Sequence, residues 1–179
     1  MIELASFEER DFDQLIAWID NEALLTNWAG SLFSFPLTHE SLAWYIKDTN
    51  DLETTDALVY KIVEQETGYT IGHISLGSIS RKNRSARISR VLIGSNAAKG
   101  KGLCKQMMEK VLSIGFDQLN LHRISLGVFD FNTTAIKCYQ SVGFTKEGHM
   151  RDVLWFKDAY WSIIEMSILK HEWTKKQTK

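Results

Sequence analysis

Two lysines and two glycines follow an apolar run in the middle of the chain, in the order Lys99-Gly100-Lys101-Gly102. The run before them has strand character, and the segment after Gly102 has helical periodicity. Glycines at a strand-to-helix turn let the backbone approach a ligand closely, and they leave the first helical N–H groups free at the positive end of the helix dipole. The turn is therefore a candidate site for an anion such as a pyrophosphate, although such turns also occur where the chain merely reverses.

A second segment, FDFNTTAIKCYQSVGF, combines an asparagine, a tyrosine and a glycine at helical spacing. Asn132 can cap a helix, and Tyr139 lies seven residues later, two turns along and about 20° around from the same azimuth. Gly143 fits the left-handed residue that ends such a helix before Phe144 packs. Each residue alone can be explained by structure, but Asn132 and Tyr139 on one face of a helix also suit a binding or proton-transfer role.

Most other chemical motifs are missing from the sequence. The GxGxxG pattern fails because Lys105 stands at its third glycine, and GxxxxGK[ST] does not occur. The five histidines are scattered without HExxH or another close spacing, so we expect no metal site. No GxSxG turn supports serine hydrolase chemistry.

Two cysteines and several aromatic residues have more than one interpretation. Cys104 and Cys138 lie in helical patterns without CxxC spacing, so reduced thiols are the simplest expectation. Cys104 could act as a nucleophile, but at the start of a helix it is more simply a small residue. Aromatic residues that could line a substrate pocket, or instead belong to the core, are Trp28, Phe33, Phe35 and Trp155.

Hydrophobic periodicity predicts the elements that position these residues. Helical spacing runs from Asp11, a candidate N-cap, to Asn21, follows Thr38 at 41–48, and recurs from Gly102 to Gln118 and from Asn132 to Val142. We read 26–38, which holds Pro36, as an irregular aromatic loop. Strand patterns lie at 57–64, 70–79, 85–94, 122–129, 145–150, 153–156 and 161–169, and 159–169 can also be read as a buried helix. The first three form an antiparallel meander, and the whole order predicts one mixed α/β domain over 1–179.

Length and composition fit a single globular domain. The chain has 179 residues, of which 44% are hydrophobic and 24% charged, and its formal net charge is -1. This balance excludes a disordered composition and argues against general nucleic-acid binding. Since the start of the chain lacks the apolar run of a signal peptide, and no apolar stretch approaches a membrane span, we expect a soluble cytoplasmic protein without a membrane partner.

Taken together, the glycine turn and the Asn–Tyr helix resemble the GNAT acyl-CoA N-acyltransferases. The closing segments look like the subgroup of ribosomal-protein alanine N-acetyltransferases and spermidine N-acetyltransferases. The resemblance covers nearly the whole chain. It rests on Lys99-Gly100-Lys101-Gly102-Leu103, Asn132-Thr133-Thr134-Ala135-Ile136, Tyr139, Gly143-Phe144, EGHMRD (147–152) and MSILKHEW (166–173).

The resemblance implies a mostly antiparallel central sheet flanked by helices, whose fourth and fifth strands splay apart to admit pantetheine. On this sequence those strands would be 86–93 and 123–129. The backbone of Val91, Leu92 and Ile93 would pair with pantetheine, with Asn132 beside it. The turn from Lys99 to Cys104, which includes Gly100, Lys101, Gly102 and Leu103, would hold the pyrophosphate of acetyl-CoA.

The same resemblance implies that the Tyr139 hydroxyl protonates the departing thiolate and that a backbone N–H near Ile93 polarises the thioester carbonyl. Relatives carry a glutamate base near the positions of Arg87 and Ser89, and neither residue can do that work. Water or another acid must serve, and the candidates, unranked, are Asp130, Asp152 and Glu147. The pattern also expects Gln or Arg where Ala97 stands, so one phosphate contact is missing.

The resulting hypothesis is an acetyl-CoA-dependent N-acetyltransferase that works by direct transfer to a primary amine. The alternative is a non-catalytic acyl-CoA-binding module, which the missing base and Ala97 favour. The acceptor stays open among a protein N-terminus, a polyamine, another small amine, an amino sugar and an aminoglycoside-like compound. A homodimer is expected if the final apolar strand, with Ile163, Ile164, Met166 and Ile168, lies at a sheet edge.

Overall fold

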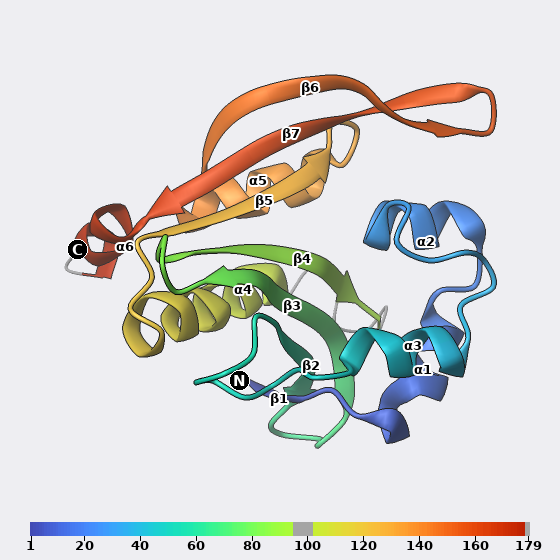
Figure 1. Cartoon of the computed structure of the whole chain (residues 1–179), viewed down its shortest axis with the longest axis horizontal. Helices are drawn as coiled ribbons and strands as arrows, with labels where there is room; N and C mark the ends of the chain where they lie inside the picture. The colour runs from blue at the N-terminus through green and yellow to red at the C-terminus, as the bar shows by residue number, and fades with distance from the viewer. Residues whose placement is uncertain (95–101, 178–179) are drawn as a thin grey trace. The chain divides into compact units, whose positions relative to one another are not determined.

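The computed structural model describes residues 1–94 and 102–177. Contacts divide the chain into a first unit, Met1–Gly77 with Ser89–Leu103, and a second unit, Ser78–Ile88 with Cys104–Lys179. The single domain therefore stays a prediction, and each unit is described by itself. The elements in Figure 1 are β1 (Ile2–Ser6), η1 (Glu9–Asp11), α1 (Phe12–Trp18), α2 (Glu22–Ala29), α3 (His39–Ile46), β2 (Leu58–Glu64), β3 (Thr70–Ser80), β4 (Ser85–Ile93), α4 (Leu103–Ser113), the π-helical turn η3 (Ile114–Gln118), β5 (Arg123–Phe129), α5 (Thr133–Val142), β6 (Thr145–Phe156), β7 (Ala159–Leu169) and α6 (Lys170–Gln177).

The strands form a seven-stranded sheet in the order β1-β2-β3-β4-β5-β7-β6. Strands β1 with β2, β2 with β3, β5 with β7 and β6 with β7 pair antiparallel. Strands β4 and β5 pair parallel through Ser85–Arg87 and Arg123–Ser125, whereas β5 pairs with β7 along all of Arg123–Phe129. A short β4–β5 ladder is what splayed strands require, and the mixed sheet with its helices confirms the predicted fold class.

The first unit buries the apolar faces of its helices against β2 and the segment after β1. Asn21 caps α2 by accepting a hydrogen bond from the Leu24 N–H at 2.8 Å, and Thr38 caps α3 in the same way from Ser41. The core cluster beneath these helices consists of Phe7, Phe12, Leu15, Ile19, Leu25, Trp28, Leu37, Leu42 and Val59. Within this unit the Trp28 ring also contacts the rings of Phe33, Tyr45 and His73.

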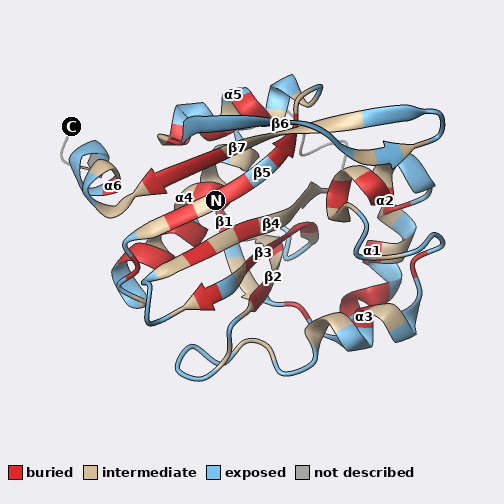
Figure 2. Cartoon of the chain, turned by 45° about the horizontal axis from the view of Figure 1, so that its top comes forward, coloured by how far each residue is buried: buried red, intermediate tan, exposed pale blue. Residues whose placement is uncertain are grey.

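The second unit alternates buried and accessible residues along β5, so one face of its strands is apolar (Figure 2). Ile124 and Leu126 are buried, while Arg123 and Ser125 between them are half-buried. A Cβ added at Gly115 of η3 would lie 2.4 Å from Cδ1 of Ile124, which shows how closely η3 packs on β5. The half-buried Arg123 of β5 and Arg87 of β4 form ion pairs with Glu147 and Glu165, respectively.

Several predicted boundaries need correction. Residues 26–29 are not part of an aromatic loop, because α2 continues to Ala29 and ends at Gly30, whose φ of 59° breaks the helix. The two strands predicted at 145–150 and 153–156 are one strand, β6. The segment 159–169 is a strand and not a helix, and β1 and α6 were not predicted.

The position of β7 also bears on the expected homodimer. It lies between β5 and β6, and β6 is the edge strand. The expected homodimer required β7 to be an edge strand, and it is not one. The homodimer is therefore not supported through the apolar residues of this strand, Ile163, Ile164, Met166 and Ile168. No helix in the described ranges has the length and apolar character needed to cross a membrane.

Candidate active site

Helix α5 presents the asparagine and tyrosine that the sequence placed on one face. The Asn132 side chain accepts a hydrogen bond from the Ala135 N–H at 3.2 Å and caps the helix. Gly143 ends it with a φ of 111°. Both capping predictions are confirmed, while the cofactor contact of Asn132 stays a prediction.

Tyr139 lies on the buried side of α5 beside Phe144, with 6% of its surface exposed and 6.2 Å between the ring centroids. Burial raises the pKa of Tyr139 to about 12. The phenol therefore keeps its proton at neutral pH and can donate a hydrogen bond, which a proton donor to a thiolate requires.

Cys104 and Cys138 form a disulfide that joins the start of α4 to α5, with 6.4 Å between their Cα atoms. The expectation of reduced thiols is therefore wrong. A separation of 34 residues says nothing about distance in space, and the missing CxxC motif excludes only local pairing. In this form Cys104 has no thiol to carry an acyl group, and Cys138 ties Tyr139, its neighbour, to α4.

The glycine turn is described only at its end. Lys99, Gly100, Lys101 and Ala97 lie outside the described residues. Gly102 has a φ of 68°, and α4 starts at Leu103, which is buried. A positive φ here suits glycine, but the pyrophosphate site itself stays a prediction.

Strand β4 is distorted just before the residues predicted to pair with pantetheine. Arg90 has a φ of 54°, unusual for a residue with a side chain. Its carbonyl oxygen accepts hydrogen bonds from Trp28 Nε1 and His73 Nδ1, both at 3.0 Å. These donors hold the strand in its strained form, and Val91, Leu92 and Ile93 follow it directly, each half-buried.

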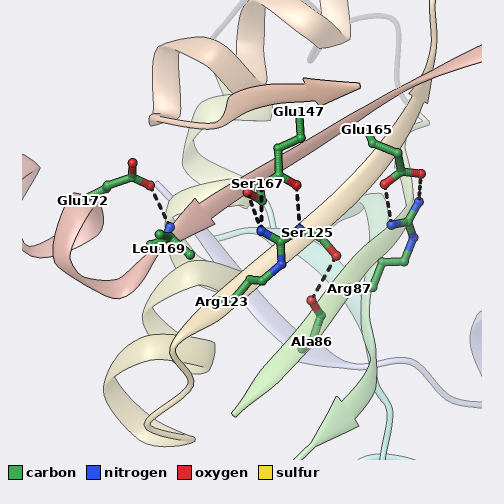
Figure 3. Close-up of polar contacts among 9 residues, drawn as sticks. All are labelled: Ala86, Arg87, Arg123, Ser125, Glu147, Glu165, Ser167, Leu169 and Glu172. Carbon is green, nitrogen blue, oxygen red and sulfur yellow. Dashed lines mark hydrogen bonds and ion pairs between the residues drawn. The ribbon is translucent and has the colours of Figure 1, made fainter. Parts of the chain in front are cut away.

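The positions where relatives carry a base are occupied by polar contacts instead. Arg87 donates two hydrogen bonds to Glu165 of β7, at 2.7 and 2.8 Å, across Gly127 of β5 (Figure 3). The Ser89 hydroxyl lies 3.0 Å from Ser75 Oγ and accepts a hydrogen bond from Arg90 Nη1 at 2.9 Å. An arginine and a hydrogen-bonded serine cannot remove a proton from an amine at neutral pH.

The three acids proposed as the base lie in different environments. Arg123 donates hydrogen bonds to both Glu147 carboxylate oxygens, at 2.6 and 2.7 Å (Figure 3), and these bonds, with one from Ser167, lower the pKa of Glu147 to about 2. The Asp152 N–H donates to Ser162 Oγ. Asp130 Oδ2 lies 3.1 Å from Nε2 of His149. Glu147 is thus a poor base.

The aromatic residues proposed for an acceptor pocket are divided between the two units, so the pocket stays a prediction. Trp28 and Phe33 stack in the first unit, with centroids 5.8 Å apart. Phe35 is exposed, and Trp155 belongs to the second unit, where it packs against Tyr160 near the β6–β7 turn. Trp28 itself is buried, and its Nε1–H donates a hydrogen bond to the Arg90 carbonyl oxygen.

Several chemically informative residues gave no signal in the sequence. They are Tyr45, His73 and Arg90 in the first unit and His149 in the second. Each is defined by partners far away along the chain, so spacing could not find it, although an arginine within an apolar strand pattern is a hint. Among the described residues, no group of three or more His, Cys, Asp or Glu side chains is placed to hold a metal ion.

Comparison with known proteins gives consistent matches. Residues 2–145 match the family model described as an acetyltransferase (GNAT) domain. The uncharacterized N-acetyltransferase p20 of Bacillus licheniformis is 35% identical over 129 residues, which cover 72% of this chain and 71% of that protein. Spermidine N(1)-acetyltransferase of Vibrio cholerae is 30% identical over 112 residues, covering 63% and 64%. The structure of spermidine N-acetyltransferase from Vibrio cholerae with CoA and spermine matches at a TM-score of 0.82 and 23% identity, over 97% of this chain and 98% of that one.

Proposed function

Because the chain belongs to the GNAT family of acetyltransferases and is an acetyl-CoA-dependent N-acetyltransferase, we propose that a primary amine attacks the bound thioester directly in a ternary complex. The observation that carries this proposal is the protonated, buried Tyr139 on the helix that Asn132 caps. A hydroxyl with a pKa of about 12 holds its proton until sulfur develops negative charge.

Full transfer of that proton to a thiolate with a pKa near 8.5 is uphill by itself. Loss of a second proton compensates for this unfavourable transfer. In the tetrahedral intermediate the nitrogen of the attacking amine is acidic, and it must lose a proton as the C–S bond breaks. Tyr139 would donate to sulfur while a base receives the nitrogen proton. The chain therefore needs a base on the amine side.

We assign that role to the pair of His149 and Asp130. Nε2–H of His149 donates a hydrogen bond to Asp130 Oδ2. In the neutral ring the other nitrogen, Nδ1, therefore carries the lone pair that can accept a proton. Asp130 lies two residues before Asn132, at the end of β5. Glu147 is less suitable, because a carboxylate with a pKa of about 2 holds a proton weakly.

Steady-state kinetics test this assignment. His149→Gln should lower kcat/KM by roughly a hundredfold or more, and Asp130→Asn should lower it to a smaller extent. His171→Gln, at an exposed histidine of α6, is the matched control and should leave kcat/KM unchanged. An unchanged kcat/KM in His149→Gln would exclude the pair.

Thiol release from acetyl-CoA tests the activity itself. The panel should hold amino acids, short peptides, polyamines and amino sugars, with a calorimetric titration of acetyl-CoA in parallel. Because relatives are named spermidine N-acetyltransferases, spermidine is the polyamine to include in this panel. Binding of acetyl-CoA without release from any amine would contradict catalysis of small-amine transfer.

A further inference from the structure

A group of polar side chains in the first unit has no role in the reaction described above. His73 of β3 and Arg90 of β4 each contain a buried polar atom without a hydrogen-bond partner, His73 Nε2 and Arg90 Nε. The Tyr45 ring of α3 is buried beside them, and side-chain hydrogen bonds with Ser75 and Arg90 partly oppose the rise in the Tyr45 pKa that burial causes. Unsatisfied buried groups are rare and costly, so the two in this cluster require an explanation.

The cluster is held together by ring contacts. The guanidinium carbon of Arg90 lies 4.8 Å from the centroid of the Tyr45 ring, and the Tyr45 and His73 rings are 5.9 Å apart. Phe33 meets Tyr45 edge-on at 5.7 Å and stacks on Trp28. Arg90 therefore lies against an aromatic wall formed by Tyr45, Phe33 and Trp28. The sequence indicates Phe33 and Trp28 as candidates for an acceptor pocket.

Arg90 also differs from two other arginines of β4 and β5 in its counter-charge. Arg87 and Arg123 each bind a carboxylate through two hydrogen bonds, to Glu165 and Glu147. The hydrogen bonds that Arg90 donates to described residues leave from Nη1 and reach neutral hydroxyls, those of Ser89 and Ser75. No carboxylate of the described residues forms an ion pair with it, and the segment 95–101 has no acidic residue.

Burying half of a guanidinium without a counter-charge costs free energy of desolvation. A carboxylate offsets this cost best, because two N–H groups of the planar guanidinium fork can donate to its two oxygens. The serines accept hydrogen bonds from Nη1, whereas the buried Nε has no hydrogen-bond partner. A polyamine has the wrong charge for this position. Arg90 is also the residue directly before Val91–Ile93, the segment expected to pair with pantetheine.

We propose that Arg90 binds a carboxylate of the acceptor, so that the acceptor is a small amine that also carries a carboxylate, as an amino acid does. This specificity rests on the proposed N-acetyl transfer. The aromatic wall of Tyr45 and Phe33 lies beside the bound carboxylate and favours an apolar or aromatic side chain on the acceptor.

Matched acceptors test the proposal. L-Phenylalanine, its amide, phenethylamine and spermidine are compared by thiol release from acetyl-CoA, with the remaining amino acids and their amides as a second set. The wild type should prefer the acids over their amides by about tenfold or more in kcat/KM, and Arg90→Gln should bring that ratio close to one. Arg84→Gln, at an exposed arginine bonded to Asn120, should keep the preference.

Two outcomes overturn the proposal: amides or spermidine preferred by the wild type, or a preference retained in Arg90→Gln whether or not its melting temperature is lower. If Arg90→Gln does not fold, Arg90→Lys keeps the charge without the fork and should lower the ratio to an intermediate value. An unchanged ratio in Arg90→Lys would count against the proposal.

Calorimetric titration of L-phenylalanine and the other amino acids into the CoA-saturated protein separates this inference from the proposed function. Binding that Arg90→Gln abolishes, without thiol release, would support the carboxylate site and contradict the transfer. No binding of any amino acid to the wild type at millimolar concentration would overturn the carboxylate site, whatever amine is acetylated.

Discussion

Tyr139 keeps its proton because burial raises its pKa, and this determines what its removal should do. Tyr139→Phe should lower kcat by roughly ten- to a thousandfold while the Kd of acetyl-CoA changes little, since the ring still packs against Phe144. Stopped-assay kinetics and calorimetry measure the two quantities. Tyr69→Phe, at an exposed tyrosine, is the control, and an unchanged kcat in Tyr139→Phe would remove Tyr139 from the mechanism.

His73 shows how a residue outside the reaction still affects the protein. Its Nδ1 donates to the Arg90 carbonyl, and burial lowers its pKa from 6.5 to about 4. The folded state therefore keeps His73 neutral at pH values where the unfolded chain already binds a proton. Stability due to this group is fully present above pH 6.5 and falls as the pH decreases toward 4.

The predicted loss can be isolated with one variant. Each pKa unit corresponds to about 1.4 kcal/mol, so this group should lower the free energy of unfolding by up to roughly 3 kcal/mol between pH 7 and 4. His73→Asn retains a donor for Arg90 without titrating in this range. Urea denaturation at pH 7, 5.5 and 4.5 should therefore show a steeper decline for the wild type, and parallel declines would contradict the assignment.

At the level of elements, the distortion of β4 depends on α2. Trp28 reaches from α2 to the Arg90 carbonyl, directly before the segment predicted to bind pantetheine. Trp28→Phe removes this donor and some buried volume, which should lower stability by about 1–2 kcal/mol and weaken acetyl-CoA binding several-fold. Trp44→Phe, at an exposed tryptophan of α3, is the control for calorimetry, and an unchanged Kd in Trp28→Phe would separate α2 from the cofactor strand.

The elements differ in how far the sequence could predict them. Helices α3 and α5 have clear caps, Thr38 and Asn132, and were predicted close to their bounds. The sequence pattern divides strand β6 in two because all of its residues are exposed or half-buried, so it has no alternating apolar pattern. The sequence pattern does not predict helix α2, because Trp28 and its neighbours are continuous with the irregularly spaced aromatic residues that follow Gly30.

The site was predictable where its residues are local. Asn132 and Tyr139 share one helix, so periodicity alone related them. The pairs Arg90 with Tyr45, His149 with Asp130 and Arg87 with Glu165 come from separate elements, and only the folded chain brings them together. The spacing of residues along the chain does not predict such contacts. For the same reason the sequence could not rank the three candidates for the general base.

At the scale of the whole chain, the disulfide is the covalent link between distant segments. It closes a loop of 34 residues that holds η3, β5 and most of α4 and α5. On the chain-entropy model, closing a loop of this size stabilises the fold by about 4 kcal/mol, mainly by restricting the unfolded state. Reduction should therefore lower the melting temperature without requiring a change in the folded structure.

A double variant, Cys104→Ser with Cys138→Ser, tests this directly. It should melt several degrees below the oxidised wild type, and a reducing agent should lower the wild type to the same level while leaving the variant unchanged. The redox state is read independently by alkylation under denaturing conditions and mass spectrometry of protein trapped with acid at lysis. Two alkylated cysteines without prior reduction would show that the pair is open under those conditions. In that case the link between α4 and α5 would depend on packing alone.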